Sequence, residues 1–153
     1  MRNSSFARKW YRRDLLGGPG ADAACGQVSE TTDLPVINGV EWQYGLCRQG
    51  SEQRLLERTK AFYQAIPASV SQTDALYEQV LSGKEGALER FAQQMKSVGR
   101  ETTALGIISV AGMAAVLVQA AERRDEYCIR AITPHLLECW RNLEETLRPL
   151  FEA

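Results

Sequence analysis

Apolar residues recur at steps of three and four along most of this chain, which is the spacing of one face of an α-helix. The longest stripe lies near the end of the sequence and comprises Ile129, Ile132, Leu136, Trp140, Leu143, Leu147 and Leu150. A second stripe comprises Leu88, Phe91, Met95 and Val98. No segment from Asn38 onward alternates apolar and polar positions for long, so the sequence predicts an all-α fold.

The first half of the helical region divides at residues that favour helix ends. Asn38 is expected to cap a short first helix that ends near Gly50. Ser51 is expected to cap a second helix, which Pro67 interrupts or bends. A third piece would close at Gly83. The inward positions of these three pieces are Val40, Tyr44 and Leu46 or Cys47, then Leu55, Leu56, Thr59, Phe62, Tyr63 and Ile66, then Val70, Leu76, Tyr77, Val80 and Leu81.

Three further helices follow in the second half. The fourth carries the stripe from Leu88 to Val98, and the fifth covers roughly residues 104–122. The last begins near Asp125 and is kinked or restarted at Pro134, because Thr133 before Pro134 is typical of a cap followed by the first helical turn. Short connections and complementary stripes favour an antiparallel four-helix bundle core with extra short helices at its N-terminal side.

Residues 102–121 form a run of twenty positions without a charge, which is long enough to cross a bilayer. The run contains glycine, threonine, serine and glutamine as well as six alanines, and it has no aromatic belt. A central helix buried in a bundle has the same all-round apolar character. We therefore expect a buried bundle helix and no membrane span.

The 153 residues fit one domain, preceded by a tail. Residues 1–33 are predicted to be this tail or linker, and residues 34–153 the helical bundle. Residues 1–16 hold five basic residues against one acidic residue, with apolar residues between them. This composition allows a short basic amphipathic helix. A solvated tail is the favoured interpretation, and an arm for membranes or nucleic acids, or a docking helix from a preceding domain, stay as alternatives.

Composition argues against several kinds of chemistry. The formal net charge of −1 gives no global sign of nucleic-acid binding. The four cysteines form no CxxC pair and His135 is the only histidine, so we expect no zinc site and no other metal or cofactor. With no secretory signal visible, the cysteines are interpreted as reduced thiols of a cytoplasmic protein.

A polar face accompanies the stripe of the fourth helix. Glu89, Gln93, Lys96 and Arg100 recur at steps of three and four, so they are expected to share a solvent-facing surface with the apolar stripe behind them.

The stretch Phe91-Ala92-Gln93-Gln94-Met95-Lys96-Ser97 resembles the signature helix of histidine phosphotransfer domains. The lead-in Leu34-Pro35-Val36-Ile37-Asn38 and the later Pro134-His135-Leu136-Leu137 are similar to other landmarks of that family. In the family an exposed histidine, followed three residues later by lysine and then by glycine or serine, shuttles phosphate between receiver-domain aspartates. The family's glycine turn into the next helix is matched to Thr102-Thr103-Ala104, which lacks the glycine.

The resemblance implies a role for each matching residue. Lys96 matches the lysine that helps to neutralise phosphoryl charge, and Ser97 matches the small residue that leaves room for the partner. Gln93 stands at the acceptor position, and its carboxamide has no nucleophilic ring nitrogen. The resemblance therefore implies a module that binds a response-regulator receiver domain or a histidine kinase without carrying phosphate and without enzymatic activity. The expected partner-binding residues are Glu89, Gln93, Gln94, Lys96, Ser97 and Arg100.

Two other interpretations remain open. The chain could be a structural helical module that dimerises or binds another partner with no receiver involved. His135 could also serve as a substitute acceptor or catalytic residue, but it has no lysine three residues later and is expected in a first helical turn, so a structural role is favoured.

Overall fold

The computed structural model describes residues 34–152, which form five helices and no strand, so the predicted all-α class is confirmed. The predicted tail, its basic helix and Cys25 lie outside the described residues. The only strand-like contact in the described part is an isolated β-bridge between Val40 and Ile107. The helices are α3 (Trp42–Gln49), α4 (Glu52–Leu81), α5 (Ala87–Leu105), α6 (Ile108–Glu122) and α7 (Glu126–Phe151).

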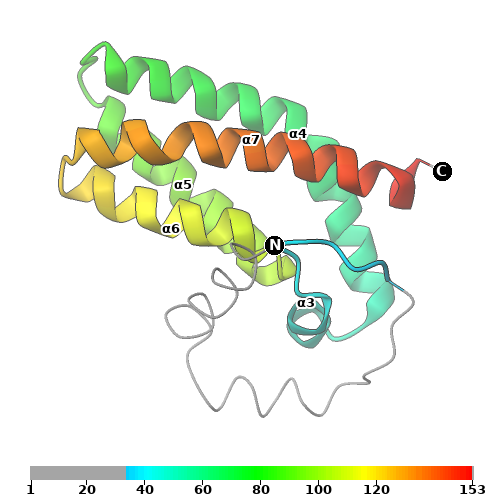
Figure 1. Cartoon of the computed structure of the whole chain (residues 1–153). Helices are drawn as coiled ribbons and strands as arrows, with labels where there is room; N and C mark the ends of the chain where they lie inside the picture. Colours follow the sequence, from blue (N-terminus) through cyan, green and yellow to red (C-terminus); the bar gives the residue numbers. More distant parts are fainter. Residues whose placement is uncertain (1–33, 153) are drawn as a thin grey trace.

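The four longer helices pack in a ring around one core (Figure 1). Each of them packs beside its neighbours along the chain, and α4 and α7 pack side by side to close the ring, whereas α5 and α7 lie diagonally across the core. The short α3 packs against α5 and α4 at one end. The largest fully buried side chains are Trp140, Phe91, Leu55, Ile66, Met95, Ile107, Ile108, Leu117, Ile129, Leu136 and Leu147.

Local signals place two helix starts correctly. The Ser51 side chain accepts a hydrogen bond from the backbone N–H of Arg54, and the Asp125 side chain accepts one from the N–H of Cys128. Both are side-chain caps that satisfy a donor which the helix itself leaves free. The first helix was expected to be capped by Asn38, but α3 begins only at Trp42. Asn38 and Gly39 lie in a turn that precedes it.

Neither proline ends its helix, so the predicted interruption at Pro67 and the predicted restart at Pro134 are wrong. Pro67 lies inside the continuous α4, so the predicted second and third pieces are one helix, and Pro134 lies inside the continuous α7. A proline within a helix costs about 3 kcal/mol, whereas each large apolar side chain that becomes fully buried stabilises the fold by about 1.5–3 kcal/mol. Phe62, Ile66 and Val70 are all buried around Pro67, so packing outweighs the lost hydrogen bond.

The predicted start of the fifth helix is also wrong, because α5 continues to Leu105 and α6 begins at Ile108. Gly106 separates them with a φ of 78°, a left-handed conformation that glycine adopts without strain. A Cβ at this position would also collide with the backbone oxygen of Glu41, whose N–H donates a 2.7 Å hydrogen bond to the Gly106 carbonyl. The lead-in to α3 therefore rests directly on this turn.

The uncharged run is thus divided between two helices. Its α6 part buries Val110, Ala111, Ala114 and Leu117 almost completely, as expected for a central helix of a bundle. Within residues 34–152, no helix combines the length and the apolar character that crossing a bilayer requires.

Candidate functional site

The predicted division of α5 into an apolar and a polar face is present in the structure. Phe91 and Met95 are fully buried, while Glu89, Gln93, Ser97 and Arg100 are exposed and Lys96 is partly exposed. The Gln93 side chain forms no hydrogen bond with any residue that the structure describes. It therefore presents a free carboxamide, which can both donate and accept hydrogen bonds, to solvent.

Gln94 differs from the other five candidate residues because its side chain turns towards α4. Its Nε2 donates a hydrogen bond of 3.2 Å to Oγ1 of Thr73, a residue that is fully buried. A buried hydroxyl without a partner would destabilise the fold, so this contact has a structural purpose. Gln94 ties α5 to α4 and is less free to contact a partner than Gln93.

Two ion pairs flank Gln93 on the side of α6. Nζ of Lys96 lies 3.4 Å from Oε2 of Glu122, and a guanidinium nitrogen of Arg124 lies 3.2 Å from Oε1 of Glu89. Together with Gln93 these residues line a shallow cavity of about 280 Å³. The positive charge of Lys96 is therefore partly balanced within the molecule.

The other side of α5 faces α4 across a second cavity of about 480 Å³. Ser97, Arg100 and Glu101 line it from α5, and Arg58 lines it from α4. Partial burial raises the pKa of the Glu101 carboxyl, and the positive charge of Arg58 opposes that rise. Arg58 was not among the residues predicted for the site, because nothing in the sequence reports which residue of α4 lies opposite Ser97.

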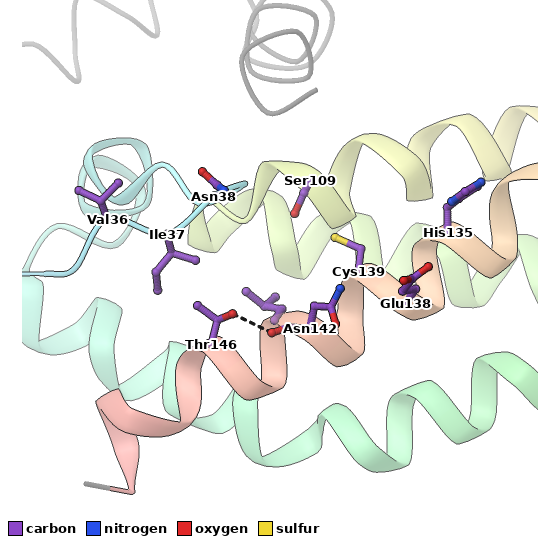
Figure 2. Close-up of a pocket in the computed structure, with 10 residues that line it drawn as sticks. Val36, Ile37, Asn38, Ser109, His135, Glu138, Cys139, Asn142 and Thr146 are labelled. Atoms are coloured by element: carbon purple, nitrogen blue, oxygen red, sulfur yellow. Dashed lines mark hydrogen bonds between the residues drawn. The ribbon is translucent and has the colours of Figure 1, made fainter. Parts of the chain in front are cut away.

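His135 lies on α7, the helix diagonal to α5, and lines a separate cavity of about 590 Å³. Figure 2 shows the Cys139 sulfur directed towards Ser109 of α6, with the His135 ring directed away from it. Burial raises the pKa of the Cys139 thiol, and its hydrogen bond with Ser109 lowers it. His135 has no hydrogen-bond or ion-pair partner among the described residues, so nothing there activates it as a base or nucleophile.

The position of the turn at Gly106 bears on how the phosphotransfer resemblance is aligned. The family's glycine turn was matched to residues 102–104, with Thr103 in place of the glycine, but the turn lies three residues later at Gly106. An alignment that starts from this turn moves the acceptor position from Gln93 to Lys96. Both residues belong to the same face of α5, and neither has an imidazole. Under either alignment, the residue at the position of the family's histidine has no nucleophilic ring nitrogen.

Comparisons with protein-family models, with curated proteins and with solved structures found no match to this chain. The phosphotransfer resemblance therefore rests on the motifs alone and stays a prediction. No group of three or more histidine, cysteine, aspartate or glutamate side chains within the described part is placed to hold a metal ion.

Proposed function

We propose that this chain is a cytoplasmic signalling module that binds a receiver domain through α5 and carries no phosphoryl group itself. The observation that carries the proposal is the exposed face of α5, where Gln93, Lys96 and Ser97 stand in the order of the phosphotransfer motif without an imidazole. The all-α bundle of residues 34–152 is a suitable frame, because it holds this face on a rigid helix.

Binding and phosphoryl transfer make different physical demands. Binding depends on a complementary surface with a polar rim, whereas transfer depends on a single nucleophile. Replacing histidine by an amide or an ammonium group removes the nucleophile and leaves the surface largely intact. A receiver domain could therefore bind α5 and remain phosphorylated, so that this chain competes with true phosphotransfer proteins.

The charges on α5 suit an acidic partner. Lys96 and Arg100 are two basic residues on one face, and the active site of a receiver domain is rich in aspartate. Complementary charge increases the rate of association and favours the correct partner. We expect a dissociation constant in the micromolar range, about −8 kcal/mol, which is usual for transient signalling contacts.

Charge reversal on α5 tests the proposal. Purified receiver domains of the source organism would be titrated with the wild type and with Lys96→Glu/Arg100→Glu, using isothermal calorimetry. We expect at least one receiver to bind the wild type and the double variant to bind about tenfold or more weakly, since two attractive charges become repulsive.

The matched control is Lys60→Glu/Arg130→Glu. Lys60 is exposed on α4, and Arg130 forms a surface ion pair with Glu126 on α7, as Lys96 does with Glu122. The control therefore makes the same change in net charge and also breaks one ion pair. Equal binding by the two double variants would contradict the assignment of the surface to α5. Self-association without binding to any receiver would favour the structural module instead.

A further inference from the structure

The charges on the two sides of α5 are arranged differently. Towards α6, Lys96 and Glu89 each have an opposite charge nearby, at 3.4 Å and 3.2 Å. Towards α4, neither Arg58 nor Arg100 forms an ion pair or a side-chain hydrogen bond with any described residue. Within residues 34–152, Glu101 is the only acidic residue that lines the cavity between them. Unbalanced positive charge therefore lies in the groove between α4 and α5.

This groove is lined by apolar as well as charged residues. Ala61, Ala104 and Leu105 line it together with Arg58 of α4 and Arg100 of α5, and its volume is about 480 Å³. Ser97 adds a hydroxyl donor to the same cavity. The apolar lining lowers the local dielectric, which strengthens the attraction of an anion to the two guanidinium groups.

We infer that the groove between α4 and α5 is an oxyanion site, in which Arg58 and Arg100 hold a phosphate or phosphoryl group and Ser97 donates a further hydrogen bond. A guanidinium group presents planar pairs of N–H donors that match phosphate oxygens. Two such groups and a hydroxyl line one cavity from two helices, and Glu101 is the only acidic residue that the described part of the chain contributes to that lining. The site itself stands independently, but its use in binding a receiver rests on the proposed function.

Neutralising Glu101 should strengthen the binding of an anion in the groove. Its carboxylate lines the same cavity and lies within the field of Arg58, so it repels any anion that enters. Glu101→Gln removes this charge with little change of shape. A neutral residue at this position should therefore strengthen binding, whereas loss of either arginine should weaken it.

The measurement is a titration of the isotope-labelled full chain with inorganic phosphate at pH 7, followed by amide chemical shifts at constant ionic strength with sodium chloride as the balancing salt. We expect saturable shifts at Arg58, Ser97 and Arg100. Arg58→Gln and Arg100→Gln should each weaken phosphate binding roughly fivefold, and Glu101→Gln should strengthen it roughly threefold. Lys60→Gln, an exposed control on α4, should leave the affinity unchanged.

Shifts that do not saturate, or affinities that are equal in Arg58→Gln, Arg100→Gln and Lys60→Gln, would overturn the inference.

A second titration tests whether phosphate displaces a bound receiver domain. Displacement of the receiver domain by phosphate would show that the receiver supplies the oxyanion that the groove binds. Phosphate binding without displacement would show that the groove binds free phosphate. If phosphate binds but no receiver domain does, the oxyanion site is supported and the proposed function is contradicted. If a receiver domain binds but phosphate causes no shifts, the proposed function is supported and the oxyanion site is contradicted.

Discussion

Lys96 of α5 and Glu122 of α6 form an ion pair beside the exposed carboxamide of Gln93, with 3.4 Å between Nζ and Oε2. The two side chains are 41% and 56% exposed, so water screens the pair strongly. The pair therefore contributes little to the stability of the bundle. Its main consequence is that Glu122 partly neutralises a positive charge on the exposed face of α5.

Glu122→Gln should release Lys96 with little cost to the fold. We expect the free energy of unfolding to fall by less than about 1 kcal/mol, as for other exposed ion pairs. Affinity for a receiver should rise by about twofold to threefold, because the lysine no longer has a competing carboxylate. Urea denaturation and calorimetry measure the two quantities, and a weaker complex would show that Glu122 itself contacts the partner.

Gly106→Ala should destabilise the bundle by about 3 kcal/mol or more. The left-handed backbone at Gly106 penalises any side chain, and the new Cβ would lie against the oxygen of Glu41. Gly83→Ala is the matched control, since Gly83 has a φ of 73° and nothing within 4 Å of its ideal Cβ. Thermal unfolding should show that Gly83→Ala lowers the free energy of unfolding by only about 1 kcal/mol. Equal losses of stability in the two variants would show that the contact between Gly106 and the lead-in to α3 does not contribute to the stability of the fold.

Ser109→Ala should slow the alkylation of Cys139. The hydrogen bond with Ser109 lowers the thiol pKa, so its removal lets burial raise that pKa further. At any pH below the new pKa a smaller fraction of thiolate is then present. Iodoacetamide labelling followed by mass spectrometry should show the midpoint of the pH profile at Cys139 moving to higher pH. Cys47 and Cys128 serve as internal controls, and an unmoved midpoint would contradict the hydrogen bond.

Introducing an imidazole separates the two alignments of the phosphotransfer motif. If the motif is aligned on Lys96 and Ser97, Gln93→His should accept phosphate from a phosphorylated receiver. If it is aligned on the turn at Gly106, Lys96→His should do so instead. Acid-labile radiolabel on the protein measures the transfer. Gln64→His, which places an imidazole on the exposed surface of α4, should remain unlabelled. A chain that binds the receiver but remains unlabelled in both variants would show that more than the nucleophile is missing.

Features that depend on a short stretch of chain were predicted from the sequence. The stripe from Phe91 to Val98 faces the core, because burial follows the 3.6-residue period of the helix whatever its neighbours are. The caps at Ser51 and Asp125 were also predictable, since each is formed within three residues.

Features that depend on packing between distant segments were not predictable in the same way. Pro67 and Pro134 favour helix ends locally, and only burial of the surrounding side chains keeps α4 and α7 continuous. The turn at Gly106 is fixed by the approach of Glu41, which lies 65 residues earlier in the sequence. The position of Arg58 opposite Ser97 and Arg100 likewise depends on how α4 and α5 are rotated against each other, which periodicity does not specify.

The most direct measurement mixes the wild-type protein with each radiolabelled, phosphorylated receiver domain of the source organism and follows both complex formation and transfer of label. We predict that at least one receiver binds through α5 and keeps its label, so that residues 34–153 remain unlabelled. Stable label on this chain, or the absence of a complex with every receiver, would contradict the account.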